Sequence, residues 1–321
     1  MPKSAFLFDF EQPIRELEHH YQHLCRMGEE DNIDMAREIK SAREKIEAKI
    51  REVYANLNSW QKVQISRHPK RPYSLDYIEN AFENFQEIHG DRNFGNDQAI
   101  IGGTAKLEGR AVMVIGQQKG RDMKENILRN FGCPNPEGYR KALRLMKMAE
   151  KFKLPIITLV DTPGAYPGVA SEERHVAEAI AVNIRDMTLL NVPVISAVIG
   201  EGGSGGALGL AVADKVLIFE FAYYSVISPE GCAAILWKDR AHAADAAEAL
   251  QLDAANLIKL GIADEVLPEP RGGAHHDQDA AIATLKKRLV ANLEKLEQLN
   301  PEKRLQLRYD KYRRIGQFLE K

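Results

Sequence analysis

The spacing of apolar side chains is helical in the first part of the chain. Between residues 11 and about 60, apolar positions recur every three or four residues in two series. The positions are Ile14, Leu17, Tyr21 and Leu24 in the first series, and Ile39, Ile46, Ile50, Val53 and Leu57 in the second. The polar stretch GEEDNID, residues 28–34, separates the two series. We therefore predict two helices that pair as a hairpin.

From about residue 98 the apolar positions form short continuous runs, which are typical of buried strands. Residues 99–121 predict two strands around a turn at residues 108–110, and further apolar runs lie at 154–160, 192–199 and 215–228. Helical patterns separate these runs. This alternation predicts an α/β fold with crossover connections.

Capping residues mark where helices begin between the strands. Asn135 followed by Pro136 predicts one helix start, Ser171 a second, and Ser228 followed by Pro229 a third. A further amphipathic helix is predicted after a linker-like segment at residues 268–279. Its apolar side chains are Ile282, Leu285, Leu289, Leu293 and Leu296.

Composition and charge exclude several classes of protein. The 321 residues carry a formal net charge of -2, which gives no reason to expect nucleic acid or an anionic membrane as a partner. No apolar run reaches the ~18 residues that span a bilayer, and the first residues lack the apolar core of a signal peptide. We expect a cytoplasmic protein without a membrane segment.

Metal ligands are not grouped in the sequence. Cys25, Cys133 and Cys232 are scattered, which fits neither a zinc site nor a disulfide framework. His19 and His23 stand four residues apart, as metal ligands on a helix can, but no third ligand lies near them in the sequence. We therefore expect no metal on this chain and solvated side chains at both histidines.

The most unusual stretch is GEGGSGGA, residues 200–207, which contains five glycines. It lacks the Gly-Lys pair of a phosphate-binding P-loop, which excludes a nucleotide hydrolase of that kind. Consecutive glycines at the start of a helix leave N–H groups unshielded, so Gly205 and Gly206 are candidate donors of an oxyanion hole. The alternative is a tightly packed strand-to-helix turn, which would need one or two glycines.

The same stretch also matches the motif G-x-S-x-G, with Ser204 as the nucleophile of a serine hydrolase. Asp214, Asp239 and His242 lie downstream and could complete a catalytic triad. Two features weaken this interpretation. The preceding strand is predicted to end at Ile199, several residues before the serine, and the upstream pattern contains helices and a hairpin in place of a series of strands.

A second loop, DTPGAYPGV at residues 161–169, follows the preceding strand. Ligands of α/β proteins bind at the carboxyl ends of strands, so Tyr166, Gly168 and Val169 could line the same pocket as the glycine run. The alternative is a rigid loop whose turns are set by its two prolines.

Two groups of basic side chains are candidate contacts to a coenzyme or a candidate site for covalent biotin. Lys119 and Arg121 follow a predicted strand and either meet the phosphates of a coenzyme or lie in a solvated turn. The triplet Met146-Lys147-Met148 is similar to the lysine-acceptor motif of biotin-carrying domains, but it lies in the middle of a predicted helix. We therefore expect Lys147 on a solvated basic face, without covalent biotin.

Five strings carry a family resemblance over almost the whole chain. They are RHPKRPYSLDYI, GQQKGR, NFGCPNPEGYRKALRLMKMAEKFKLPIITLVDTPGAYPGV, VIGEGGSGGALG and YSVISPEGCAAILWK. These strings closely resemble the carboxyltransferase α subunits of bacterial acetyl-CoA carboxylases. The resemblance implies a crotonase-like α/β fold, a spiral of ββα units with an N-terminal helical hairpin and a C-terminal helix. The expected division is a helical segment for subunit assembly at 1–70, the crotonase-like carboxyltransferase domain at 71–300 and a C-terminal tail at 301–321.

The resemblance also implies a reaction. The family transfers a carboxyl group from carboxybiotin, held on a separate biotin carboxyl carrier protein, to acetyl-CoA, which forms malonyl-CoA in the first committed step of fatty acid synthesis. Amides of Gly205 and Gly206 would stabilise the ureido oxygen of biotin. The residues expected to line the biotin pocket are Tyr166, Gly168, Val169 and Gly203.

The implied partners are a β subunit with a four-cysteine zinc ribbon, in an α2β2 assembly, together with the carrier protein and biotin carboxylase. This chain lacks the ribbon cysteines, in agreement with an α subunit. The β subunit would hold the enolate of acetyl-CoA, so activity is expected only in its presence. Two alternatives remain, a serine hydrolase acting through Ser204 and a catalytically silent scaffold that uses its N-terminal hairpin for assembly.

Overall fold

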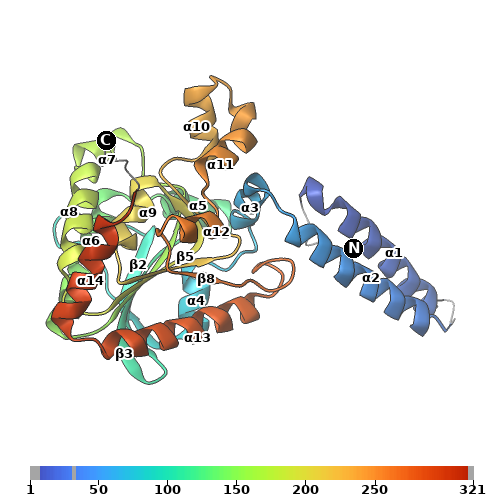
Figure 1. Cartoon of the computed structure of the whole chain (residues 1–321), viewed down its shortest axis with the longest axis horizontal. Coiled ribbons are helices and arrows are strands. Elements are labelled where there is room, and N and C mark those ends of the chain that lie inside the picture. Colours follow the sequence, from blue (N-terminus) through green and yellow to red (C-terminus); the bar gives the residue numbers. More distant parts are fainter. Residues whose placement is uncertain (1–7, 31–33, 317–321) are drawn as a thin grey trace, which may run out of the picture.

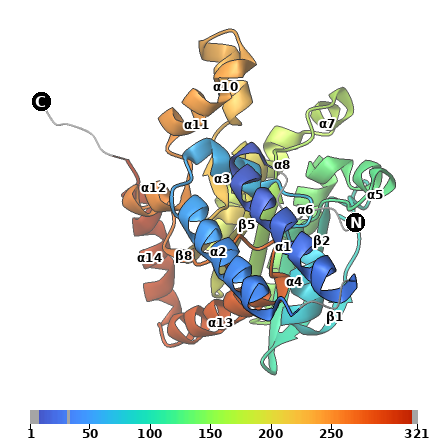
Figure 2. The ribbon, with the colours of Figure 1, turned by 90° about the vertical axis from the view of Figure 1, so that its right-hand side faces the viewer.

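The computed structural model describes residues 8–30 and 34–316. A helical hairpin projects from one side of the body of the molecule (Figure 1), and its two helices lie side by side when that side faces the viewer (Figure 2). It consists of η1 (Asp9–Glu11), α1 (Gln12–Glu30) and α2 (Ala36–Ala55), and α1 packs against α2. The predicted hairpin is therefore confirmed, although part of its polar break lies outside the described residues.

The hairpin is attached to the body through its root. Ile14 and Tyr54, one from each helix, lie in an apolar cluster with Ile65 and Phe221 of the body. The chain then enters α3 (Ser59–Ser66) and α4 (Ser74–Ala81). Asn58 caps α3, because its side chain accepts a hydrogen bond from the N–H of Gln61.

The body is built on one mixed sheet. Among the described residues it has eight strands in the order β1-β2-β3-β4-β5-β6-β8, with β7 paired to the far half of β5. The first two pairings are antiparallel and the others are parallel. The strands are β1 (Glu83–Glu87), β2 (Ile100–Leu107), β3 (Arg110–Gln117), β4 (Ile156–Thr162), β5 (Val194–Gly203), β6 (Lys215–Phe219), β7 (Tyr223–Ser225) and β8 (Glu265–Leu267).

The predicted hairpin of residues 99–121 is confirmed as β2 and β3, joined at Glu108 and Gly109, which both have positive φ. The predicted end of β5 is wrong, because the strand continues past Ile199 to Gly203. The extension exists because Glu201 pairs with Tyr223 of β7, a contact that no local pattern reveals.

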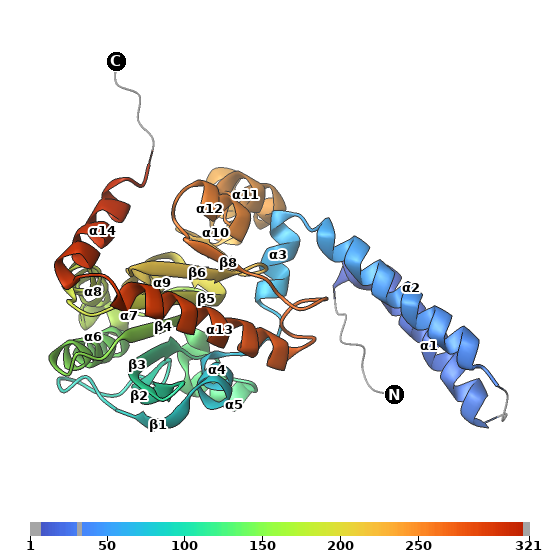
Figure 3. The same cartoon turned by 60° about the horizontal axis from the view of Figure 1, so that its bottom comes forward.

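Helices cover both faces of the sheet. On one face α6 packs on β2 and β3, and α9 packs on β4 and β5. Helix α8 packs against both α6 and α9. Helices α4 and α13 contact the sheet and each other (Figure 3). The helices after α4 are α5 (Met123–Leu128), η2 (Asn130–Gly132), α6 (Pro136–Lys151), α7 (Val169–Glu173), α8 (Val176–Leu189), α9 (Ser204–Ala211), α10 (Pro229–Leu236), η3 (Arg240–His242), α11 (Ala243–Leu250), α12 (Ala254–Lys259), α13 (Gln278–Glu297) and α14 (Pro301–Arg313).

The predicted helix starts have mixed outcomes. Ser228 caps α10 as predicted, accepting from the N–H of Gly231. Asn135 stands at the N-cap position of α6, but its side chain caps no N–H group and instead accepts from Arg174. The helix predicted from Ser171 is divided into α7 and α8, because His175 adopts φ 65 between them, and Ser171 lies inside α7.

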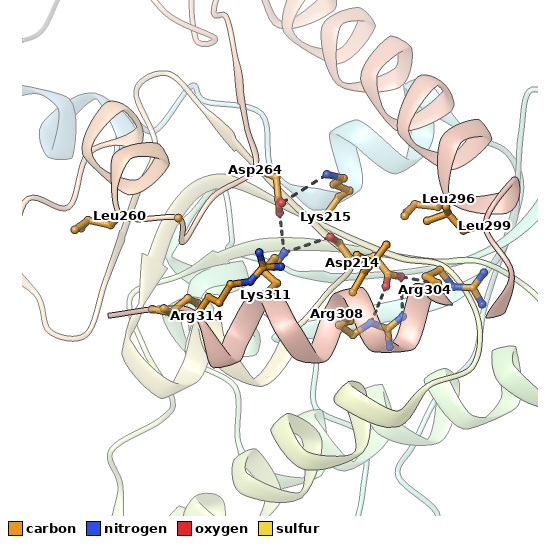
Figure 4. Close-up of a pocket in the computed structure, with 13 residues that line it drawn as sticks. Asp214, Lys215, Leu260, Asp264, Leu296, Leu299, Arg304, Arg308, Lys311 and Arg314 are labelled. Atoms are coloured by element: carbon orange, nitrogen blue, oxygen red, sulfur yellow. Dashed lines mark hydrogen bonds and ion pairs between the residues drawn. The ribbon is translucent and has the colours of Figure 1, made fainter. Parts of the chain in front are cut away.

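The C-terminal segment differs from the tail predicted for residues 301–321. Residues 301–313 form α14, and the fully buried guanidinium of Arg308 donates to Asp214 at 2.8 and 2.7 Å (Figure 4). Arg308 also donates to three backbone carbonyls around the end of α8. A cavity of about 430 Å³ lies beside these groups, where Lys311 pairs with Asp264. Residue 300 is therefore no boundary in the packing of the described chain.

Candidate functional site

Two loops meet where β4 and β5 end, at the carboxyl edge of the sheet. Gly203 lies so close to the other loop that a Cβ atom on it would stand 2.1 Å from the carbonyl oxygen of Pro163. On Gly206 a Cβ atom would stand 2.5 Å from the backbone nitrogen of Ala165. Only glycine permits backbones to approach this closely, so packing explains both positions.

Packing also explains two further glycines of the run. A Cβ atom on Gly200 would stand 2.6 Å from Oδ1 of Asp161, and one on Gly202 would stand 2.8 Å from the carbonyl oxygen of Tyr223. The expectation that a packed turn needs only one or two glycines was therefore wrong, because four of these five are needed. Gly205 is different. The nearest atom to its Cβ position is Cγ2 of Ile180 at 3.8 Å, so steric demand does not account for this glycine.

Gly205 lies in the first turn of α9, where N–H groups have no acceptor within the helix. This turn is held in place by buried side chains. The carbonyl oxygen of Gly206 accepts from Nε2 of Gln117 at 2.7 Å and from the hydroxyl of Tyr139 at 3.2 Å. Asn183 donates to the carbonyl of Gly209 at 3.1 Å. The first turn therefore offers fixed N–H donors, as an oxyanion hole requires.

An apolar groove of about 310 Å³ runs beside this turn. Gly205 and Ser204 form part of its wall. The other lining residues come from α9, β6, β7, α12 and the C-terminal helix and their flanks: Leu208, Ala211, Val216, Tyr224, Ser225, Val226, Leu257, Ile262, Tyr312 and Ile315. The groove thus joins exposed backbone donors to a largely apolar surface.

The residues predicted to line the biotin pocket do not share one cavity. Tyr166 and Gly168 line a separate cavity of about 420 Å³ with residues of α7 and α8, and the Tyr166 ring covers Gly168. Val169 is 76% exposed and lines neither of the two cavities, while Gly203 is buried at the loop contact. Of the two predicted oxyanion donors, Gly205 lines the groove and Gly206 does not, while Ser204, the nucleophile of the alternative interpretation, lines it as well.

Beneath the two loops lies a buried ionic cluster that the sequence analysis missed. Nζ of Lys119 is 2.6 Å from Oδ1 of Asp161 and 2.8 Å from Oε2 of Glu201. The Lys119 side chain is only 12% exposed, so the predicted solvated turn is wrong. Burial alone would lower the pKa of Lys119, but the two carboxylates outweigh it and raise the pKa. An ammonium held in this way is an internal counter-ion, which argues against a contact with coenzyme phosphates.

Glu201 has partners on its other side as well. Its Oε1 accepts from Nε of Arg67 at 2.7 Å and from the hydroxyl of Tyr223 at 3.0 Å. Burial would raise the pKa of Glu201, but Lys119 and Arg67 lower it to about 2. A general base needs a pKa near the working pH, so Glu201 is a fixed charge and not a proton acceptor.

Arg121, the second predicted phosphate contact, is also engaged within the chain. Its guanidinium stacks 3.9 Å from the ring centroid of Tyr73 and donates to the carbonyls of Pro69 and Arg71. It also pairs with Asp76. These contacts favour a structural role in holding the segment before α4.

Ser204 has the backbone geometry of a nucleophile elbow. It follows β5 directly and adopts φ 53, so the objection that the strand ends too early no longer holds. However, within the described chain its hydroxyl has no hydrogen-bond partner that could act as a base. The elbow is present without a triad.

The three residues proposed to complete that triad are engaged elsewhere. Asp214 accepts from the N–H of Val194, at the opposite end of β5 from Ser204. Asp239 caps η3, and Nδ1 of His242 bonds to Asp245 at 2.8 Å on the surface. The serine hydrolase interpretation therefore lacks its base and its acid.

One more cluster lies at the root of the hairpin. Glu11 approaches His275 and His276 of the loop between β8 and α13. Its members come from distant parts of the chain, so no local sequence pattern brings them together. The adjacent histidines in a segment interpreted as a linker were the available signal.

The comparisons with known proteins agree with this architecture. A family model described as acetyl co-enzyme A carboxylase carboxyltransferase-like matches residues 7–316. Proteins named acetyl-coenzyme A carboxylase carboxyl transferase subunit alpha are similar over nearly their whole length. That of Geobacter metallireducens is 54% identical over 318 residues, 99% of each chain, and that of Halorhodospira halophila is 53% identical over 309 residues, 96% of this chain and 97% of the relative.

Among solved structures, the transcarboxylase 12S core with methylmalonyl-coenzyme A bound matches with a TM-score of 0.56 and 20% identity, over 68% of this chain and 40% of that chain. The β subunit of P. aeruginosa geranyl-CoA carboxylase matches with a TM-score of 0.54 and 15% identity, over 74% of this chain and 44% of that chain. This chain spans less than half of either structure, and the likeness confirms the crotonase-like α/β fold.

None of these comparisons supports a serine hydrolase. Within the described residues, no helix combines the length and the apolar character needed to cross a bilayer. The match to the family model and the identity to the curated relatives cover nearly all of the sequence. The chain belongs to the family of acetyl-CoA carboxylase carboxyltransferase α subunits, which are carboxyltransferases.

Proposed function

We propose that the groove beside the first turn of α9 receives the ureido ring of carboxybiotin, presented by a separate carrier protein. The observation that carries this proposal is Gly205, which borders the groove although a Cβ atom there would make only ordinary contact with Ile180 at 3.8 Å. The groove also suits the ligand. A small, mostly apolar bicyclic ring with one polar edge matches an apolar wall that ends in backbone donors.

Carboxybiotin supplies the carboxyl group that acetyl-CoA receives. The role of this chain is to stabilise negative charge on the ureido oxygen as that group leaves, through the N–H groups of Gly205 and Gly206. One donor of this kind contributes about 3–4 kcal/mol to the transition state. Because Gln117 and Tyr139 fix the turn, the donors need no reorganisation when charge develops.

The described residues that line the groove include no side chain that acts as a base near neutral pH. Burial raises the pKa of Tyr224 and raises that of Tyr312 to about 12, so neither hydroxyl accepts a proton near neutral pH. Among the residues that line the groove, none has a carboxylate or an imidazole. We infer that the proton of the acetyl methyl group leaves to a group other than these side chains, and that a second subunit completes the site.

We infer that the second subunit is a zinc-ribbon β subunit, in an α2β2 assembly in the cytoplasm that works with the carrier protein and biotin carboxylase. Exposed apolar side chains around α10 support a partner surface: Val226 is 76% exposed, Ile235 60% and Leu236 65%. Clustered apolar side chains of this kind mark protein interfaces. The N-terminal helical segment, residues 1–70, provides a second surface for assembly.

The test removes one N–H donor without a steric clash. Gly206 is unsuitable, because any side chain there meets the backbone of Ala165. We choose Gly205→Pro, combined with Ser204→Gly because Ser204 has φ 53, a left-handed conformation that glycine adopts without strain, and a proline restricts the residue before it. Ser204→Gly alone and Gly205→Ala, which keep the N–H group, are the matched controls.

Malonyl-CoA formation is measured on complete assemblies whose size is verified by chromatography. The proline double variant should lose about 10²–10³ in rate, while both controls keep most of their activity. A fully assembled double variant within tenfold of the Ser204→Gly rate would contradict the oxyanion role. Loss of activity in Ser204→Gly alone would instead point to the serine hydroxyl.

A further inference from the structure

A compact group of metal-ligand side chains lies at the root of the N-terminal hairpin, away from the groove beside α9. Glu11, His275 and His276 each offer one ligand atom, and these three atoms all lie within 4.8 Å of one another. Glu11 is fully buried and His275 is 5% exposed. None of these residues lines the groove.

His275 is the observation that points to a ligand. Both of its ring nitrogens are buried without a hydrogen-bond partner in the described structure. Its ring stacks on the ring of His68, with 3.9 Å between the ring centroids, and its centroid lies 4.5 Å from that of His276. Buried polar atoms in proteins almost always have a partner, so an imidazole with two orphaned nitrogens calls for a bound species.

The neighbouring carboxylate is already oriented. Oε1 of Glu11 accepts from the Tyr54 hydroxyl at 2.5 Å, and Oε2 accepts from the N–H of Phe8 at 2.8 Å. Metal-binding carboxylates are commonly held by such outer hydrogen bonds, which fix their orientation.

We propose that Glu11, His275 and His276 form a binding site for one divalent transition-metal ion, of which Zn²⁺ is the best match. Two imidazole nitrogens and one carboxylate oxygen are a donor set that Zn²⁺ accepts, whereas Ca²⁺ and Mg²⁺ prefer oxygen donors alone. The bound ion joins the first turn of the hairpin to the loop before α13. It is a structural clamp that sets how the hairpin leaves the body, and it replaces the expectation of a chain without metal.

The experiment uses the full-length chain without a tag and without its partner, so that zinc on another subunit is not counted. The chain is stripped with a chelator, incubated with excess ZnCl₂ and desalted, and zinc is measured by elemental analysis. One zinc per chain is expected, with a thermal midpoint that rises when zinc is added. Incubation with Co²⁺ in place of zinc should give the visible absorption bands of a protein-bound ion.

Glu11→Gln, His275→Ala and His276→Ala should each reduce retained zinc at least tenfold and abolish the zinc-dependent rise of the melting midpoint. The matched control is His19→Gln with His23→Gln, which removes the exposed histidine pair on α1 and should change neither. Circular dichroism verifies that each variant is folded. Glu11→Gln preserves side-chain shape, so it remains decisive if His275→Ala does not fold.

Two results would overturn the proposal. One is retention of less than a tenth of a zinc ion per chain by the unmodified protein. The other is uptake that persists in folded Glu11→Gln and His276→Ala but disappears in the His19/His23 control, which would assign the metal to the surface pair.

Discussion

Replacing Lys119 by methionine tests whether the ionic cluster supports the two loops. Its ammonium is the shared partner of Asp161 and Glu201, at 2.6 and 2.8 Å, and both carboxylates are almost completely buried. Methionine has a similar length but no charge. The substitution therefore leaves two buried negative charges with one counter-ion fewer and little change in packed volume.

The expected magnitude follows from this arrangement. Removing one partner of a buried ion pair costs about 3–5 kcal/mol, because the remaining charge stays desolvated. At roughly 2 °C per kcal/mol for a chain of this size, the melting midpoint should fall by about 6–10 °C. Adding Asp161→Asn removes one of the two stranded charges, and this second substitution should recover about 1–3 kcal/mol.

Urea unfolding of the purified chain measures these differences. Lys147→Met is the matched control, because Nζ of Lys147 lies 2.8 Å from Asp186 while its side chain is 57% exposed. An exposed ion pair contributes about 0–1 kcal/mol, so this variant should remain close to the unmodified protein. Both variants remove one lysine that pairs with a carboxylate, so the difference between their stabilities reports the effect of burial.

Equal destabilisation by Lys119→Met and Lys147→Met would show that burial does not strengthen the role of Lys119. The coupling between Lys119 and Asp161 is refuted if Asp161→Asn adds its own full cost to Lys119→Met. Additive costs would mean that the two groups do not interact in the folded protein, whatever their distance.

Two further predictions concern buried charges. Lys119 and Arg67 lower the pKa of Glu201 to about 2 against the effect of burial, so its contribution to stability is complete above its ordinary pKa of about 4.5 and is lost as pH falls towards 2. The urea midpoints of Glu201→Gln and the unmodified chain should therefore differ at pH 7 and converge only as pH approaches 2. Arg308→Met should leave Asp214 buried without its main partner, and this should lower the free energy of unfolding by about 3–5 kcal/mol. Hydrogen exchange in α14 should then increase. Unchanged exchange there would show that α14 is held by other contacts.

Much of the fold could be predicted because its signals are local. In the helical hairpin, apolar positions recur at helical spacing. The connection between β2 and β3 has only two residues, and such a short connection defines the turn. The end of β5 could not be predicted in this way. Its last residues read as a glycine loop, and they are a strand only because Glu201 pairs with Tyr223. The break between α7 and α8 at His175 could not be predicted either, because no glycine or proline marks it in the sequence.

The site could be predicted in kind but not in detail. The glycine run correctly indicated N–H donors at the start of a helix, but the individual glycines are required for different reasons. Gly203 and Gly206 are glycine because Pro163 and Ala165 lie against them, whereas a side chain on Gly205 would meet no close neighbour. That distinction depends on the neighbouring loop, which is about forty residues away in sequence, and only the three-dimensional arrangement supplies it.

The ionic cluster and the glycine run are parts of one arrangement. Oδ1 of Asp161 accepts from Lys119 and also from the N–H of Glu201 at 2.9 Å, and this contact needs the missing side chain of Gly200. Buried ion pairs are often no more stable than apolar residues of the same volume, so stability alone does not account for them. Directional bonds from Asp161 fix the end of β5 in a way that apolar packing would not. Because α9 begins directly after that end, the same bonds determine where the N–H of Gly205 lies.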